Sequence, residues 1–124
     1  MVSEIVVTLP LPPKELAPNS RPHWASKARA VKRYREYAWA CAMAEISVID
    51  GFKPWREAAC TARFFFATKR RRDRDNLLAS LKAAFDGLAD ARVVLDDSGI
   101  SHRVEIGEPD PAFPRVEITV RGIE

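Results

Sequence analysis

Hydrophobic and polar residues alternate along four short segments, and a repeat of two residues is typical of β-strands with one buried face. The segments are residues 5–9, 58–68, 100–106 and 115–121. In the second segment Phe64 and Phe65 are adjacent, so both faces are apolar. We expect this strand either to be central in the sheet beneath two layers or to be covered by a second subunit.

Two longer segments repeat apolar residues every three or four positions, which predicts amphipathic helices. The longer helix is expected over residues 24–49, and the shorter one begins at Asp75 or Asn76, one of which caps it. On a continuous helix, Lys82 and Asp86 each lie within about 20° of the direction of Asp75, so the three form a polar stripe. The apolar side of this helix comprises Leu77, Leu81, Ala84, Phe85 and Leu88.

Together these elements predict a single small domain of the α+β class over residues 1–124. It has a mixed, mostly antiparallel sheet of about four strands and two main helices. A hydrophobic fraction of 47% with 30% charged residues excludes a disordered chain and a membrane protein. The N-terminal segment lacks a basic region and is broken by prolines, so we expect no signal peptide and no membrane partner.

The two cysteines, Cys41 and Cys60, are not at a metal-ligand spacing. We therefore expect buried thiols in a reducing cytoplasm, and no organic cofactor. A loop over residues 14–22 leads to Trp24, whose indole either packs in the core or stacks on an exposed base. Core packing is the expectation for Trp24, with His23 on the surface. His102 is expected to be a packed or surface imidazole rather than a ligand.

The net charge of +3 is small, but the basic residues are clustered. One cluster ends the second predicted strand, and the other occupies the first half of the long helix. Clusters of this kind suit a phosphate backbone, although a charged helix face is equally consistent with simple solvation. The predicted nucleic-acid-binding residues are Lys69, Arg70, Arg71, Arg72 and Arg74 in the first cluster, and Lys27 and Lys32 in the second.

Acidic residues follow the first cluster directly. Asp73 and Asp75 lie where extended chain becomes helix, and Asp96 and Asp97 follow the same helix. If the loop after the helix doubles back along the sheet, Asp96 or Asp97 joins the first pair, and carboxylates brought together in this way favour a hard divalent cation. A D-x-D pair alone more often caps a helix or faces solvent. Four adjacent positive charges favour a place where phosphate and metal meet.

The sequences RRRDRDN (70–76), KAAFDGL (82–88) and LDD (95–97), with LPLPP (9–13) and PNSRPHW (18–24) before them, occur in this order. As a set they resemble the RusA-type Holliday junction resolvases, which are small dimeric magnesium-dependent endonucleases, and in particular the phage-type members. The resemblance implies that Asp73, Asp75 and Asp97 bind metal and that Lys82 is the essential lysine. In the enterobacterial form the lysine follows the second aspartate by four residues, whereas Lys82 follows Asp75 by seven.

The resulting hypothesis is hydrolysis of phosphodiesters in branched DNA, such as a four-way junction, with Mg²⁺ as cofactor and Mn²⁺ as the alternative. Lys82 adds positive charge near the reacting phosphate, Asp96 supports the metal ligands indirectly, and a homodimer supplies two sites. Two alternatives stay open. One is a non-enzymatic DNA-binding phage accessory protein of the same fold, and the other is a nuclease that acts on RNA, flaps or other branched nucleic acid.

Overall fold

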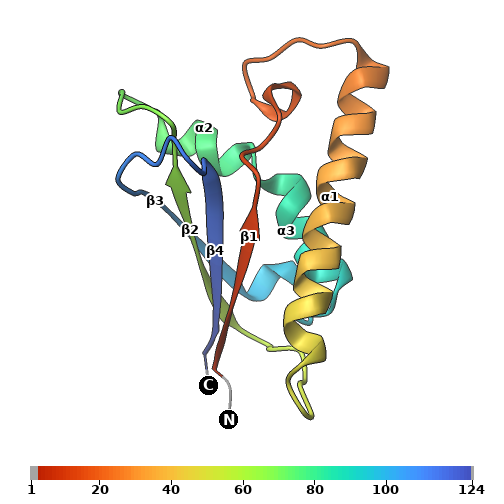
Figure 1. Ribbon diagram of the computed structural model, residues 1–124. Helices are drawn as coiled ribbons and strands as arrows, with labels where there is room; N and C mark the ends of the chain where they lie inside the picture. The colour runs from red at the N-terminus through yellow and green to blue at the C-terminus, as the bar shows by residue number, and fades with distance from the viewer. Residues whose placement is uncertain (1–2, 124) are drawn as a thin grey trace.

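The computed structural model describes residues 3–123 and, within them, every side chain except that of Asp97. The elements are β1 (Glu4–Leu9), the 3-10 turn η1 (Lys14–Leu16), α1 (Trp24–Ser47), β2 (Ala58–Phe65), α2 (Arg74–Ala79), α3 (Lys82–Asp90), the 3-10 turn η2 (Asp97–Gly99), β3 (Ile100–Ile106) and β4 (Arg115–Gly122). All four predicted strands and the long helix are confirmed. The structure is a small α+β domain (Figure 1).

The strands form one mixed sheet in the order β1-β4-β2-β3. Strand β4 is antiparallel to both β1 and β2, and β3 is parallel to β2. The predicted mixed, mostly antiparallel sheet is therefore confirmed. Strand β2 lies inside the sheet, as its two apolar faces predict.

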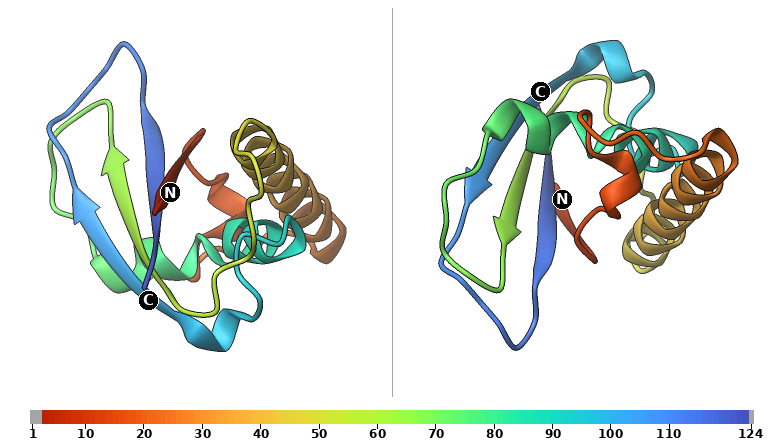
Figure 2. Two further views of the ribbon diagram at one scale, coloured as in Figure 1. Left: turned by 90° about the horizontal axis from the view of Figure 1, so that it is seen from below. Right: turned by 90° about the horizontal axis from the view of Figure 1, so that it is seen from above.

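Helices α1 and α3 cover one face of the sheet (Figure 2). That face supplies the core, because alternate residues of β1, β2 and β4 point toward the helices and are buried, including Val7, Phe64 and Ile118. On the other face, Phe65 is covered by the guanidinium group of Arg115, which lies 4.0 Å from the ring centroid. A side chain of β4 thus shields the second apolar face of β2.

The shorter predicted helix is broken in two. Helix α2 ends at Ala79, α3 begins at Lys82, and Leu81 has φ −95° and ψ 3°, outside the usual helical range. The hydroxyl group of Ser80 donates to the carbonyl oxygen of Leu77 at 2.6 Å, a side-chain contact of the kind that competes with regular helix geometry. The prediction of one continuous helix is therefore wrong. Its apolar side is confirmed, since Leu81, Ala84 and Leu88 are buried and Leu77 and Phe85 pack against the core.

Helix α1 packs closely on α3. Its buried side is made of Ala30, Tyr34, Ala38 and Ala42. A methyl group added at Gly87 of α3 would overlap the carbonyl oxygen of Arg35, so the two backbones approach as only glycine permits. The Tyr34 hydroxyl donates to the carbonyl oxygen of Pro10 at 2.7 Å and ties α1 to the chain that leaves β1.

Trp24 is not in the core. It is the first residue of α1 and 77% of its surface is exposed, so the prediction of core packing is wrong. The buried residue of the preceding segment is Leu16 in η1, which fills the space under this end of α1. Cys60 is buried, as predicted, and burial raises the pKa of its thiol to about 12, whereas Cys41 is half-buried. Within residues 3–123, no helix combines the length and apolar character needed to cross a membrane.

Candidate nucleic-acid and metal site

Asp73 and Asp75 both lie at the beginning of α2. Asp73 is the N-cap, and its Oδ1 accepts hydrogen bonds from the backbone N–H groups of Asp75 (2.9 Å) and Asn76 (3.2 Å). The prediction that Asp75 or Asn76 caps the helix is wrong because Asp73, with ψ 117°, is the last extended residue. The Oδ2 atom of Asp73 is outside these hydrogen bonds. Asp75 is exposed in the first helical turn.

Residues 69–72, which we call the basic loop, lie directly before this acidic pair. The loop borders the ends of β2 and β3, because Phe66, Arg70 and Arg72 share a small cavity with Ile106. The guanidinium group of Arg72 stacks on Phe66, with Cζ 3.5 Å from the ring centroid. This stacking holds one cation of the loop in a defined position.

Arg72 is partly buried and has no ion-pair partner in the described structure. Its Nε atom is buried and has no hydrogen-bond partner within the described structure. Burial lowers the pKa of Arg72, and the nearby charge of Arg70 lowers it further. No described carboxylate forms an ion pair with Arg70, Arg71 or Arg72, whereas Arg35, Arg63 and Arg115 are all paired. The basic loop thus offers positive charge that the described part of the protein does not neutralise.

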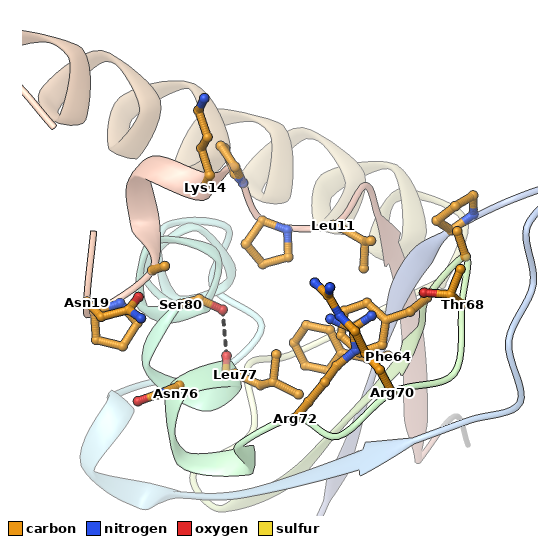
Figure 3. Close-up of a pocket in the computed structure, with 17 residues that line it drawn as sticks. Leu11, Lys14, Asn19, Phe64, Thr68, Arg70, Arg72, Asn76, Leu77 and Ser80 are labelled. Atoms are coloured by element: carbon orange, nitrogen blue, oxygen red, sulfur yellow. Dashed lines mark hydrogen bonds between the residues drawn. The ribbon is translucent and has the colours of Figure 1, made fainter. Parts of the chain in front are cut away.

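A cavity of about 640 Å³ lies between η1, the basic loop and α2 (Figure 3). We call it the α2 pocket. Its apolar lining includes Leu11, Phe64, Phe66 and Leu77, and polar side chains surround it. In Figure 3, Arg70 and Arg72 reach toward Leu11 from one side, and Asn19 and Asn76 lie on the other. Nothing in the sequence indicated this pocket, because its walls come from segments far apart in the chain.

The loop after α3 lies beside the chain that enters β2. Leu95 donates its backbone N–H to the carbonyl oxygen of Trp55 at 2.9 Å, and Gly99 packs against the backbone of Arg56, so the segment lies beside the chain that enters β2. Asp73 follows the opposite end of β2. Residues 66–72 lie between that end and Asp73, and the helix that Asp73 begins contacts β3.

The structure does not place the side chains of Asp73, Asp75 and Asp97 around one position. The side chain of Asp97 lies outside the described structure, although its backbone begins η2. Asp96 has its Oδ1 atom 3.1 Å from the backbone nitrogen of Ser98, from which it accepts a hydrogen bond. Among the described side chains, no three Asp, Glu, His or Cys residues are placed to hold one metal ion. Asp73 and Asp75 both lie at the start of α2, and the described side chains supply no third ligand beside them.

Lys82 is the first residue of α3 rather than a member of α2. Its Nζ donates to Asp86 at 3.2 and 3.4 Å, and Asp86 also lies 3.9 Å from Arg35. Because the helix is broken before Lys82, the predicted stripe with Asp75 is not formed on one helix. The Lys82 side chain is 77% exposed in this ion pair.

The remaining predicted residues lie on α1 and β3. Lys27 and Lys32 are both exposed on α1. The His23 side chain caps this helix, with Nδ1 accepting from the backbone of Ala25 at 3.2 Å, and its ring lies 5.6 Å from that of Trp24. His102 is exposed on β3, and its ring lies 4.3 Å from that of Phe85.

No protein-family model matches the chain. Over 119 residues it is 37% identical to a protein of Xylella fastidiosa (strain Temecula1 / ATCC 700964), and the alignment covers 94% of this chain and 76% of that protein. The chain belongs to the same family as this Xylella protein. The relative is described only as an uncharacterized protein, so membership of the family assigns no activity.

Proposed function

We propose that the protein is a Mg²⁺-dependent endonuclease of the RusA type that cuts branched DNA such as four-way junctions. One observation carries the proposal. A loop of four basic residues, without a carboxylate partner in the described structure, leads directly into the two carboxylates of Asp73 and Asp75. A phosphate held by the loop would lie beside the position of a metal ion bound by those carboxylates.

The residues present fit a magnesium ion that also contacts its substrate. Magnesium in phosphoryl-transfer sites commonly takes one or two carboxylates, with water and phosphate oxygens as the other ligands. The free Oδ2 of Asp73 and the exposed carboxylate of Asp75 supply such a pair. When bound, Mg²⁺ would lower the pKa of an attacking water and offset negative charge on the phosphate. Mn²⁺ would serve the same carboxylates.

The other residues would act on the DNA backbone. The guanidinium groups of the basic loop would hold phosphates without reading bases, so recognition would depend on the shape of the branch. Lys27 and Lys32 would extend this surface onto α1. Asp97 is the third metal ligand, and Lys82 the essential lysine, that the resemblance implies. A homodimer would place two such sites on one junction.

A second candidate is a DNA-binding protein of the same fold that does not cut. The position of Lys82 favours it, because the helix is broken before Lys82 and the lysine does not share one helix with Asp75. A site with only two protein carboxylates would bind Mg²⁺ more weakly. Binding of a junction without cleavage in either Mg²⁺ or Mn²⁺ would identify this second function.

The test is cleavage of an end-labelled four-way junction during a Mg²⁺ titration, beside a linear duplex, a flap, a fork and an RNA hairpin. We expect cleavage of the junction in preference to the duplex. Asp75→Asn should lower the rate by about 100-fold or more, a loss typical when one electrostatic catalytic contact is removed. Junction binding in Ca²⁺ should remain. The matched control is Asp50→Asn, which removes an exposed carboxylate of the turn after α1 and should leave the rate within a few-fold.

The role of Asp97 is tested in the same assay. Asp97→Asn should behave as Asp75→Asn if Asp97 is a ligand, and its neighbour Asp96→Asn should retain most of the activity. Full activity of Asp97→Asn would remove Asp97 from the metal site. Full activity of Asp75→Asn would remove the metal assignment at α2 altogether.

A further inference from the structure

The α2 pocket has the size and lining of a small-molecule site. Its volume of about 640 Å³ falls within the range of about 300–1,000 Å³ that is common for ligand pockets. Leu11, Phe64 and Leu77 line it, together with four prolines. Such walls suit a flat ring with apolar faces, because binding removes the apolar surface of the ring and that of the pocket from water.

The charged side of the pocket indicates an anionic ligand. Arg70 and Arg72 both line it, and no described carboxylate pairs with either. Their mutual repulsion contributes to the lowered pKa of Arg72. Arg72 is also held on Phe66 with an unused donor at Nε. A phosphate between the terminal nitrogens of the two guanidinium groups would relieve this repulsion, since it accepts several charge-assisted hydrogen bonds.

The opposite side of the pocket can read the edge of a ring. Asn19 and Asn76 line it, and the side-chain amides of both face solvent without a hydrogen bond in the described structure. An asparagine amide offers one donor and one acceptor side by side, which matches the edge of a nucleobase. In Figure 3 these two residues lie across the pocket from Arg70 and Arg72.

We propose that the α2 pocket binds one unpaired nucleotide, with its phosphate on Arg70 and Arg72 and its base between the apolar walls and the two asparagines. The source of that nucleotide, a branched DNA strand, rests on the proposed function. Asp73 follows Arg72 directly, so the bound nucleotide would adjoin the phosphate presented to the acidic pair. A base in a duplex is stacked and paired, so entry would favour substrates whose bases are already unpaired at a branch.

The experiment measures binding without metal and without cleavage. Each of the four 2′-deoxynucleoside 5′-monophosphates is titrated into ¹⁵N-labelled full-length protein, and the Arg72 Nε–H, Asn19 amide and Asn76 amide resonances are followed. The matching nucleosides and inorganic phosphate are titrated in parallel. We expect saturable shifts at all three residues with the nucleotides. We also expect at least ten-fold weaker binding of either the nucleoside or the phosphate alone.

Two variants with the same change of charge localise the effect. Arg70→Gln should weaken nucleotide binding by about ten-fold, because it removes a charged hydrogen bond. Arg71→Gln should change it by less than two-fold, since Arg71 is the neighbour that does not line the α2 pocket. Both residues are exposed, and circular dichroism melting checks that both variants fold. Asn76→Ala should weaken nucleotide binding while leaving phosphate binding unchanged.

Three results would overturn the inference. They are equal affinity for inorganic phosphate and nucleotide, no shift at Arg72 Nε, and an equal loss in Arg70→Gln and Arg71→Gln. The proposed function fails on a different observation. Nucleotide binding in the pocket with no cleavage of any branched substrate would retain this inference and reject the nuclease. Cleavage without nucleotide binding would do the reverse.

Discussion

Arginine serves two different purposes in this protein, and comparing the two regions shows what separates them. Between α1 and α3, Arg35 donates to Asp90 at 2.6 and 2.9 Å. At the start of β4, Arg115 donates to Asp110 and Glu117, each at 2.8 Å, and covers Phe65. In the basic loop, Arg70 and Arg71 are exposed without a carboxylate partner in the described structure.

The difference lies in the partners rather than in the residue type. A guanidinium group that already holds a carboxylate in a bidentate contact must break that contact before it can bind a phosphate. The basic loop has no such contact to break among the described residues. Counting basic residues along the chain would treat both regions alike, although only one of them presents uncommitted charge.

The largest effect is expected from removing charge from the basic loop. The double variant Arg70→Gln, Arg71→Gln should weaken junction binding by about ten-fold or more and lower the slope of log affinity against log salt by about 2. The control is the double variant Arg35→Gln, Arg63→Gln, which has the same change of net charge but removes paired arginines. Its salt slope should stay near the wild-type value. Equal slopes for the two double variants, measured by fluorescence anisotropy, would break the comparison.

The paired region should respond in stability instead. Gly87→Ala forces α3 away from α1, because the added methyl group overlaps the carbonyl oxygen of Arg35. Overpacking of this kind costs about 1–3 kcal/mol, so the urea midpoint should fall. Gly51→Ala is a contrasting change, since open space surrounds Gly51 but its φ of +70° strains any other residue. Junction binding by the folded Gly87→Ala protein should be unchanged.

A smaller loss of stability is expected from Arg115→Gln. The substitution removes hydrogen bonds to Asp110 and Glu117 and uncovers Phe65. The thermal midpoint should fall by less than in Gly87→Ala but by more than in Arg103→Gln, which removes one 3.5 Å ion pair of a side chain that is 75% exposed. An Arg115→Gln protein as stable as wild type would show that this cluster contributes nothing.

The smallest effect is a pH dependence. Hydrogen bonding to Arg35 lowers the pKa of Asp90 below its ordinary 3.8, and Arg63 lowers that of Glu105 below 4.5. A lowered folded pKa means that the contribution to stability is present above the ordinary value and is lost as the pH falls through the folded value. Urea midpoints should therefore fall slightly below about pH 4.5. Because both pairs are exposed, the fall should be small, and smaller still in Arg35→Gln.

Much of the fold could be predicted from local pattern because the responsible forces act over short stretches of chain. Alternation along residues 115–121 identified β4, and its Val116, Ile118 and Val120 are all buried. The three-to-four repeat placed α1 and the apolar side of α3 correctly. The break before Lys82 was missed because it depends on a side-chain hydrogen bond of Ser80 that no periodicity reveals.

The candidate site was predicted only in part for the same reason. The basic loop and the Asp73–Asp75 pair are contiguous, so the sequence alone placed them together. Whether Asp96 and Asp97 join them depends on where η2 lies. The parallel pairing of β2 with β3 sets Ile100 beside Ala58, so η2 lies beside the chain that enters β2. Strand pairing is a long-range choice, and the local sequence of LDD carries no signal for it.

By itself the sequence determined the class of fold, the positions of the strands and of the long helix, and the juxtaposition of four basic residues with two acids. Only the tertiary structure decided which arginines are paired, that Trp24 is exposed, and that the α2 pocket exists. The physical reason is that periodicity reports the burial of each segment one residue at a time. Ion pairs such as that of Arg35 with Asp90, and cavities such as the α2 pocket, arise from contacts between segments that are distant in the chain and meet only when it folds.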